Sequence, residues 1–180
     1  MRAVFRPLLA IIAAIELSQP SIDADRAQVI AKALQHEANT HDFDPLTGVS
    51  IIFHESGFDP NAISRSGEDY GLAQIRARYI GACKGTKDPV SNPTAACRRE
   101  KQRLLDPVYN IQVMADLITR NRAFCKSKVG SALFARWLAS YQGRNYPKQN
   151  RWCQPGEGTW KVINYRKHLV RQINKQKKKR

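Results

Sequence analysis

Acidic residues are in short supply in this 180-residue chain. Its 15 Asp and Glu stand against 30 Lys and Arg, which leaves a formal net charge of +15 and a sequence pI of about 10.1. An excess of this size predicts attraction to a polyanion, and nucleic acid, anionic lipid and acidic cell-wall polymers all qualify. Charge alone does not choose among the three.

Cysteine is sparse as well, and its four residues form no C-x-x-C pair, which disfavours a structural zinc site. The histidines show no metal-ligand spacing with Cys or Asp, and no cofactor is implied. An even cysteine count suits two disulfides in an exported protein. Of the three possible pairings, Cys83 with Cys97 and Cys125 with Cys153 is favoured, because local loops close at the lowest entropic cost. The alternative is four free thiols in a cytosolic protein.

An apolar run long enough to span a bilayer is also missing. The N-terminal run from Leu8 to Ile15 is too short to cross a membrane comfortably, and it follows Arg2 and Arg6. This order is typical of a secretory signal, and with the cysteines it predicts export to the periplasm or the extracellular space. No clean small-x-small cleavage site is present, so an extra helix packed on the domain, or an uncleaved anchor, is the alternative. The predicted division of the chain is a signal peptide or anchor over 1–24, one domain over 25–175 and a basic flexible tail over 176–180.

Strand signals are weak throughout and no internal repeat is visible, so the sequence predicts a mainly α protein. The chain is about one domain long and large enough to bury a core. Helical spacing or helix-start signals predict helices over 23–42, 45–56, 108–122, 131–141 and 158–176. A further short helix is expected over 72–80. Residues 81–104 form a long, poorly periodic insertion that holds two of the cysteines.

The helix predicted over 45–56 carries a lone acid, Glu55, near its end. Asp44 is a natural N-cap, Pro45 suits the first helical position, and Gly57 is the expected stop. On a helical wheel Glu55 lies at the edge of the apolar face. Partial burial and the negative end of the helix dipole both disfavour the ionised carboxylate and predict a raised pKa. A general acid that works near neutral pH requires such a pKa, although a surface Glu near a helix end is also common.

The residues from Glu55 onward resemble the catalytic motif of the soluble lytic transglycosylases, relatives of goose-type lysozyme. The family pattern has Glu-Ser at a helix end, then a Pro-x-Ala-x-Ser loop, then Gly-Leu-x-Gln. Here these are ES at 55–56, PNAIS at 60–64 and GLAQI at 71–75. The likeness continues through LLDPVYNIQVMADLI, which looks like the family's Asp-Pro-x-x-Asn-Ile helix, and ends at LASYQG. It covers roughly residues 27–145 and implies a lysozyme-like domain of several packed helices around a glycan cleft.

Matched position by position, the resemblance implies roles for five residues. Glu55 would be the general acid/base. Gln74 would line the glycan groove, and Tyr141 would lie within reach of Glu55 or the sugar. Ser56 and Ser64 would support the loop. Plainer alternatives remain: Gln74 could tie the loop, Tyr141 could be a core residue, and Ser64 could make turn hydrogen bonds.

The chain departs from the family pattern in two places. The Asn that usually follows the tyrosine is replaced by Gln142, which Gly143 and Arg144 follow. The cysteine-bearing insertion and the basic C-terminal third lie outside the shared pattern. The details of substrate binding therefore do not follow from the resemblance.

The resemblance implies a reaction in which one carboxyl group acts twice. The glutamate protonates the oxygen that links N-acetylmuramic acid to N-acetylglucosamine. Once ionised, it takes the proton of the sugar's 6-hydroxyl as a 1,6-anhydro ring closes. A hydrolytic muramidase would instead use a second carboxylate to activate water, and Glu68, Asp69 and Asp59 are the nearby candidates. A third alternative is a non-catalytic basic module that binds glycan or another polyanion.

The C-terminal third is strongly basic, with twelve Lys or Arg and one acid, Glu157, from Arg144 onward. Trp152, Trp160 and Tyr165 interleave with these basic residues, a pattern of nucleic-acid binding or of sugar stacking beside an anionic wall. No nucleic-acid module is recognisable, which disfavours nucleic acid as the partner. The sequence predicts a monomer that binds peptidoglycan glycan strands, with anionic wall polymer or a membrane surface as a further contact of the basic region.

Overall fold

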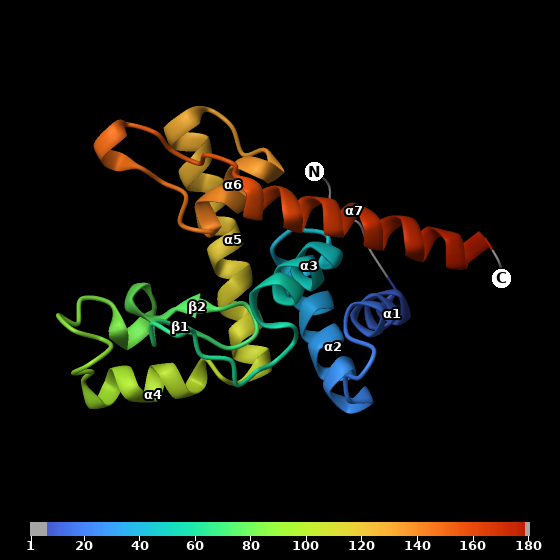
Figure 1. The fold of residues 1–180 in the computed structure, drawn as a ribbon, viewed down its shortest axis with the longest axis horizontal. Coiled ribbons are helices and arrows are strands. Elements are labelled where there is room, and N and C mark those ends of the chain that lie inside the picture. The colour runs from blue at the N-terminus through green and yellow to red at the C-terminus, as the bar shows by residue number, and fades with distance from the viewer. Residues whose placement is uncertain (1–6, 179–180) are drawn as a thin grey trace.

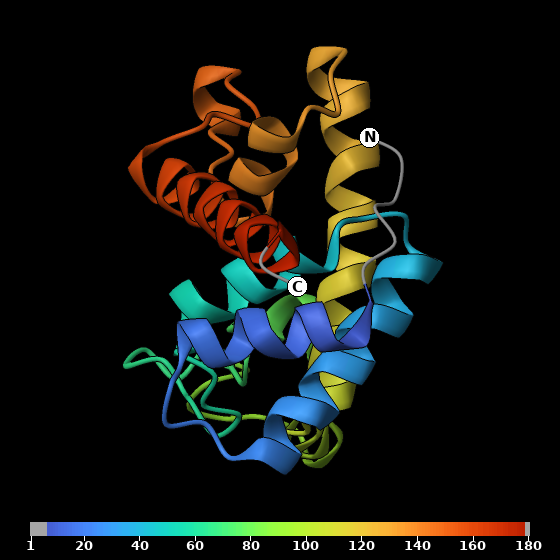
Figure 2. The same ribbon diagram turned by 90° about the vertical axis from the view of Figure 1, so that its right-hand side faces the viewer.

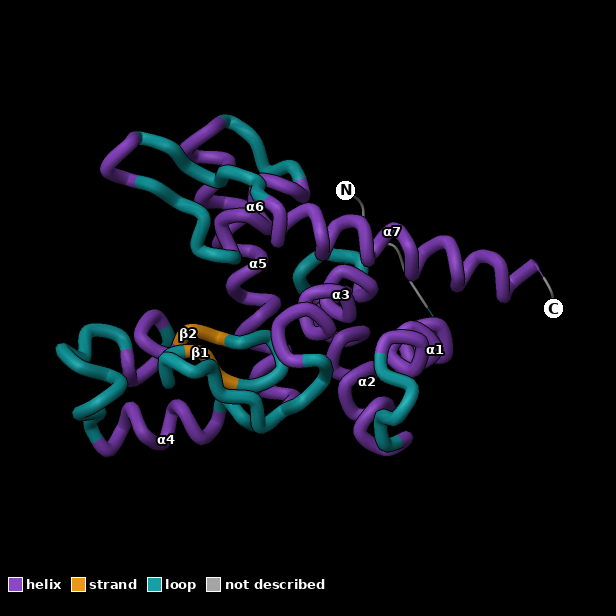
Figure 3. Tube along the Cα trace, viewed as in Figure 1, coloured by secondary structure: helices purple, strands orange, loops and turns teal. Residues whose placement is uncertain are grey.

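Helices dominate the fold, as the sequence predicts. The computed structural model describes residues 7–178, so Arg2 and Arg6 of the predicted signal lie outside the described residues. The helices in the described part are α1 (Leu8–Ser18), α2 (Ala24–Thr40), α3 (Pro45–Ser56), α4 (Ala95–Arg103), α5 (Pro107–Val129), α6 (Phe134–Tyr141) and α7 (Glu157–Lys178). Figure 1 shows α5 rising through the middle, with α4 at lower left and α1 at right. The tube in Figure 3 shows how little strand accompanies these helices.

Helix α3 begins and ends as its sequence signals predict. The Asp44 carboxylate accepts a hydrogen bond from the backbone N–H of Leu46 at 3.1 Å, and Pro45 occupies the first turn. Such a start satisfies a backbone donor that a helix otherwise leaves unpaired. The helix ends at Gly57, whose φ of 60° lies in the left-handed region that favours glycine. The predicted bounds of 45–56 are confirmed.

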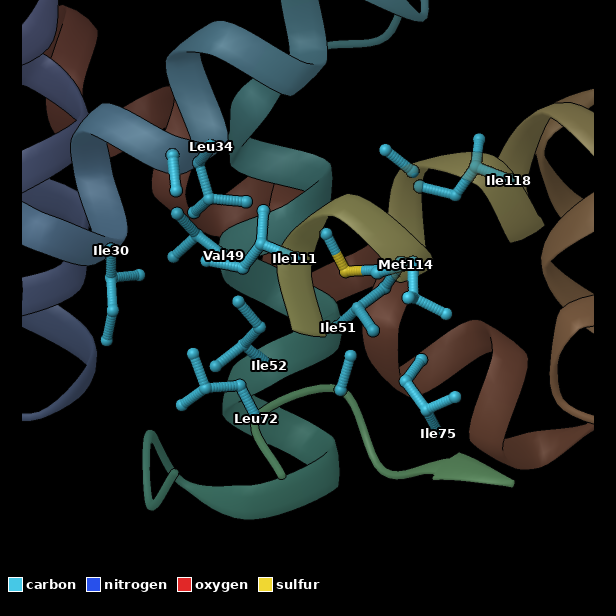
Figure 4. Close-up of a cluster of buried hydrophobic side chains, with 14 of the residues drawn as sticks. Ile30, Leu34, Val49, Ile51, Ile52, Leu72, Ile75, Ile111, Met114 and Ile118 are labelled. Carbon is cyan, nitrogen blue, oxygen red and sulfur yellow. The ribbon is translucent and has the colours of Figure 1, made fainter. Parts of the chain in front are cut away.

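The core surrounds α3, whose residues from Pro45 to Ile52 are all buried. Figure 4 shows side chains of α2, α5 and the segment after α3 converging on it. The fully buried aliphatic side chains that the figure labels include Ile30, Leu34, Ile52, Leu72, Ile111 and Met114. A Cβ at Gly48 would lie 2.4 Å from the Leu34 side chain, so glycine is what allows α2 to approach this closely.

The C-terminal helix α7 closes the core against both ends of α3. At the start of α3, Asp44 forms a buried ion pair with Arg166 of α7 at 2.6 Å. Near its end, Phe53 stacks on Tyr165 of α7 with ring centroids 4.3 Å apart. The Tyr165 hydroxyl in turn donates a hydrogen bond to the hydroxyl of Ser18 in α1 at 2.8 Å. Helices α1, α3 and α7 are therefore tied together.

The segment between α3 and α4 carries two short strands, β1 (Asp69–Tyr70) and β2 (Ile75–Arg76), paired antiparallel with Tyr70 opposite Ile75. The short helix predicted over 72–80 is therefore wrong. Only a turn of 3-10 helix, η1 (Ala77–Tyr79), forms there. The physical reason is Gln74, whose φ of 45° reverses the chain and is incompatible with a continuing right-handed helix.

The insertion over 81–104 is more ordered than its poor periodicity indicates. A 3-10 turn, η2 (Gly81–Cys83), is joined to α4 by the Cys83–Cys97 disulfide, with an S–S distance of 1.97 Å. The Thr94 hydroxyl caps α4 by accepting a hydrogen bond from the N–H of Cys97 at 3.1 Å. The cross-link and the cap thus order a segment that offers little apolar surface.

A second disulfide joins Cys125 of α5 to Cys153, with an S–S distance of 2.02 Å, so both predicted pairings are confirmed. Cys153 lies in a loop between α6 and α7 that we call the C-terminal hairpin (residues 144–155). An isolated bridge between Tyr146 and Arg151 closes it around the 3-10 turn η3 (Pro147–Gln149). The hairpin is thereby clamped to the end of α5.

The N-terminal apolar segment forms α1 and packs on the domain. Ile11, Ala14 and Ile15 are fully buried against neighbouring helices. Figure 2 shows α1 crossing α2, with α7 nearby. Within residues 7–178, no helix combines the length and apolarity that a membrane crossing requires. The signal-peptide interpretation of 1–24 stays a prediction, and the packed helix is the alternative that this geometry favours.

Substitution in α1 separates these two interpretations. We expect Ile15→Asp to lower the melting temperature of the purified protein by roughly 10 °C, because an unpaired charge at a fully buried position costs several kcal/mol. Leu9→Asp is the matched control, since Leu9 in the same helix is 71 % exposed, and it should leave the melting temperature unchanged. Equal melting temperatures for both variants and the wild type would show that α1 is absent from the folded protein.

Candidate active site

Glu55 lies in the last turn of α3, the most deeply buried helix of the fold. The apolar residues before it fix the helix in the core, and the left-handed Gly57 turns the chain away immediately after it. The carboxyl group is partly buried. Within the described residues it makes neither a hydrogen bond nor an ion pair. A buried acid without a partner is costly to ionise.

The environment raises the pKa of Glu55 to about 7. Burial, which withholds water from the charged form, is the larger cause, and the negative charge of Asp69 adds to it. The group is therefore present in substantial amounts as both acid and base near neutral pH. This is the titration behaviour expected of a side chain that first gives and then takes a proton.

Tyr141, at the C-terminal end of α6, lies beside Glu55. Its hydroxyl donates a hydrogen bond to the carbonyl oxygen of Ala73 at 3.2 Å, which joins α6 to the segment after β1. Burial and the negative charge of Glu55 both raise the pKa of Tyr141 well above its usual value. The phenol therefore stays neutral, and it can offer a polar contact near the acid without adding charge.

Gln74 holds the turn between β1 and β2 rather than standing free. Its Nε2 donates to the carbonyl oxygens of Ala62 at 3.0 Å and Gly71 at 2.9 Å. Both amide protons are therefore used within the protein. This matches the plainer alternative, in which Gln74 ties the loop, and among the described residues its Oε1 has no hydrogen-bond donor.

The two serines make local contacts. The Ser64 hydroxyl accepts a hydrogen bond from the N–H of Asp69 at 3.0 Å and contacts the hydroxyl of Ser66 at 3.0 Å. Ser56 makes only a long bond, 3.4 Å, to the carbonyl of Ile52 one turn earlier. Both therefore stabilise backbone geometry around Glu55, and neither points to a separate chemical task.

A buried asparagine that the sequence reasoning assigned no role organises this region. Asn110 of α5 is fully buried. Its Oδ1 accepts from the N–H of Ala73 at 2.8 Å, and its Nδ2 donates to the carbonyls of Tyr70 and Leu104 at 2.9 and 2.7 Å. The signal that could have found it is a polar residue at a position of the apolar stripe of α5. Its amide thus fixes the segment on which Tyr141 and Gln74 depend.

At Gly71 the turn between β1 and β2 lies directly against Leu104 and Asn110. Its φ is 71°, and a Cβ there would lie 2.2 Å from the carbonyl oxygen of Leu104 and 2.4 Å from Nδ2 of Asn110. No side chain fits between the turn and α5 at this place. The glycine that opens the GLAQI motif is therefore required by packing.

Two of the other acids near Glu55 are paired with arginines. Asp69 pairs with Arg76 at 2.9 Å, and Glu68 pairs with Arg78 at 2.5 Å. Asp59 is exposed and accepts a hydrogen bond from a backbone N–H two residues on. Among the described residues, Glu55 thus differs from Asp69 and Glu68 in having no cationic partner.

Neither a cluster of metal ligands nor the hollow beside α5 coincides with this site in the described residues. In the part of the chain that the structure describes, no group of three or more His, Cys, Asp or Glu side chains could hold a metal ion. A hollow of about 300 Å³ lies between α5 and the turn at Ile80 and Gly81, and its lining does not include Glu55. The site is instead defined by its acid and the tyrosine beside it.

The site thus combines a partly buried acid at a helix end with a tyrosine whose pKa that acid raises, in a mainly helical domain. Residues 32–142 match the family model of the transglycosylase SLT domain. This is more than half of the chain, which therefore belongs to the SLT family. Neither a curated protein nor a solved structure shows significant similarity to it. Family membership supports a transglycosylase-type, glycan-cleaving function on peptidoglycan.

Proposed function

We propose that the protein is a peptidoglycan lytic transglycosylase with Glu55 as its only general acid/base. It would cleave the β-1,4 bond between N-acetylmuramic acid and N-acetylglucosamine and leave 1,6-anhydro-N-acetylmuramic acid ends. The observation that carries the proposal is the lone Glu55, whose pKa is raised to about 7 by burial. Gln74 and Tyr141 are proposed to contact the glycan, with Ser56 and Ser64 in supporting roles.

In the first step, protonated Glu55 gives its proton to the glycosidic oxygen as the bond from that oxygen to the anomeric carbon breaks. The substrate's own N-acetyl group can stabilise the positive charge that develops on the carbon. In the second step, the Glu55 carboxylate removes the proton of the sugar's 6-hydroxyl. The oxygen of that hydroxyl then bonds to the anomeric carbon and closes the 1,6-anhydro ring. Glu55 ends in its starting state, and no water is consumed.

The rival reaction is hydrolysis by a muramidase with a second carboxylate. Asp69 is the first candidate, because its negative charge contributes to the raised pKa of Glu55. Its carboxylate is already paired with Arg76 at 2.9 Å, and this contact favours a supporting role over activation of water. Glu68 is likewise engaged, by Arg78. The ion pairs therefore favour the one-carboxylate reaction.

Mass spectrometry of the products tests the proposal directly. Digestion of purified peptidoglycan, and of defined glycan strands, should give muropeptides with anhydro ends and none with added water. Products that carry water would identify a muramidase instead. No loss of turbidity with wild-type protein would identify a non-catalytic glycan-binding module.

The pH dependence of cleavage should reveal the state of Glu55. Because the first step needs the protonated acid, we expect the rate to fall as pH rises above about 7. In Asp69→Asn, one cause of the raised pKa is removed, so this fall should move to lower pH while anhydro products persist. Initial rates between pH 5 and 9 measure the shift. A hydrolytic role for Asp69 would instead abolish activity at every pH.

We also propose that the protein acts outside the cytoplasm, in the periplasm or the extracellular space. The two disulfides are typical of an oxidising compartment, and peptidoglycan lies in such a place. Cys83–Cys97 and Cys125–Cys153 both hold loops that carry little apolar surface of their own. The two loops therefore depend on a compartment that keeps both disulfides oxidised.

A further inference from the structure

One stretch of the chain has no acidic residue at all. From residue 117 to residue 156 the sequence contains no Asp or Glu but eight Lys or Arg. Three of the eight, Arg122, Arg136 and Arg144, donate partly buried hydrogen bonds to main-chain carbonyls. Lys126 also donates to a carbonyl, that of Gly130, but at an exposed position. The remaining basic side chains therefore determine the charge of the surface that this stretch presents.

Four of them gather where the C-terminal hairpin meets the end of α5, and we call this surface the basic lobe (Lys126, Lys128, Lys148 and Arg151). All four are exposed, and none takes part in the ion pairs among the described residues. Figure 1 shows the hairpin and the end of α5 side by side at the upper left, and the Cys125–Cys153 disulfide joins them.

Aromatic rings hold the basic lobe in place. The ammonium group of Lys128 lies 5.0 Å from the ring centre of Trp152, and the guanidinium of Arg151 lies 5.8 Å from that of Tyr146. The Trp152 ring also makes an edge contact with Phe124 at 5.6 Å. The charges are therefore presented on a cross-linked, aromatic-backed surface, unlike those of a free tail.

The hairpin that carries half of the basic lobe follows α6, which ends at Tyr141, directly in sequence. The hairpin begins three residues after Tyr141, and the N–H of Arg144 donates to the carbonyl of Ala139 in α6 at 2.9 Å. Gln142, which replaces the family's usual Asn, accepts a hydrogen bond from Thr159 of α7 at 2.8 Å. The hairpin lies beyond the SLT match, which ends at residue 142.

We propose that the basic lobe binds the carboxylates of peptidoglycan stem peptides, next to the strand that is cleaved at Glu55. The proposal rests on the proposed function for the identity of the polymer. That polymer carries acidic peptides along its glycan, and exposed Lys and Arg attract carboxylates at a surface that lacks opposing acids. The lobe would thus raise affinity for peptide-bearing strands over bare glycan.

Binding of an inactive variant tests this without cleavage. In a Glu55→Gln background, sedimentation with purified peptidoglycan gives the half-saturating concentration at low and high salt. Adding Lys148→Glu with Arg151→Glu should weaken binding about tenfold at low salt. The matched control is Lys167→Glu with Arg171→Glu on exposed positions of α7, which changes net charge equally and should weaken binding less than twofold. Melting temperatures of both double variants check folding.

The same proteins are then bound to glycan strands from which an amidase has removed the stem peptides. The tenfold difference should vanish on these strands. Equal weakening by both double variants would show that only net charge matters. A difference that persists on strands without stem peptides would show that the lobe does not bind the peptides. Either result overturns the proposal. The proposal would also be overturned if the Lys148→Glu, Arg151→Glu variant lost binding to a short oligonucleotide but kept its binding to peptidoglycan. That result would identify nucleic acid as the partner. Failure of the proposed function would appear separately, as wild-type protein that releases no anhydro products.

Discussion

Glu55→Gln should reduce cleavage of peptidoglycan about a thousandfold. The amide has nearly the shape of the acid but can neither give nor take the proton. The neighbouring acids Asp69 and Glu68 are paired with arginines. Release of soluble muropeptides, followed by chromatography, measures the loss. Undiminished release by this variant would overturn the assignment of Glu55.

The same variant should be more stable than the wild type above neutral pH. The pKa of Glu55 is raised on folding from 4.5 to about 7, so the folded state prefers the protonated acid. The stability from this preference is complete below pH 4.5 and is lost as pH rises through 7. Gln is neutral at every pH, so its advantage at pH 8 should be about 1–3 kcal/mol in the free energy of unfolding. Denaturant unfolding at pH 5 and pH 8 separates this effect from misfolding.

Asn110→Ala should destabilise the protein by about 3–5 kcal/mol. The substitution leaves the N–H of Ala73 and the carbonyls of Tyr70 and Leu104 buried without their present partner. Activity should fall further than stability alone explains, because the Ala73 carbonyl also receives the hydrogen bond of Tyr141. Denaturant unfolding and cleavage rates, both at a temperature where the variant is folded, measure the two effects.

A matched asparagine on the same helix provides the control. Asn121 of α5 is partly buried and donates one hydrogen bond to the carbonyl of Leu117, one turn earlier. We expect Asn121→Ala to cost about 1 kcal/mol and to leave cleavage unchanged. If the two alanine variants were equally stable and equally active, Asn110 would not organise the site.

Local signals predict the parts of this protein that depend on local chemistry. Helix α3 is found because Asp44, Pro45 and Gly57 specify its ends within a few residues of chain. The two disulfides follow the same rule, since each joins cysteines that are near in sequence. The raised pKa of Glu55 is also predicted, because the helical wheel already places it at the edge of the buried face.

The parts that escape prediction depend on contacts between distant residues. The turn at Gln74 is shaped by hydrogen bonds to Ala62 and Gly71 that no helical pattern reveals, which is why 72–80 was expected to be a helix. The three hydrogen bonds of Asn110 reach residues 6 to 40 positions away. Helix α4 is hidden because a disulfide and a cap, not an apolar stripe, order it.

The ion pair between Asp44 and Arg166 spans 122 positions of sequence, so its two partners are synthesised far apart in time. A growing polypeptide presents the start of the acid-bearing helix long before it has the arginine that secures it. Until α7 has been synthesised, the helix that carries Glu55 lacks its contacts with α7. The contact that anchors the start of α3 can therefore form only after the C-terminal helix has been synthesised.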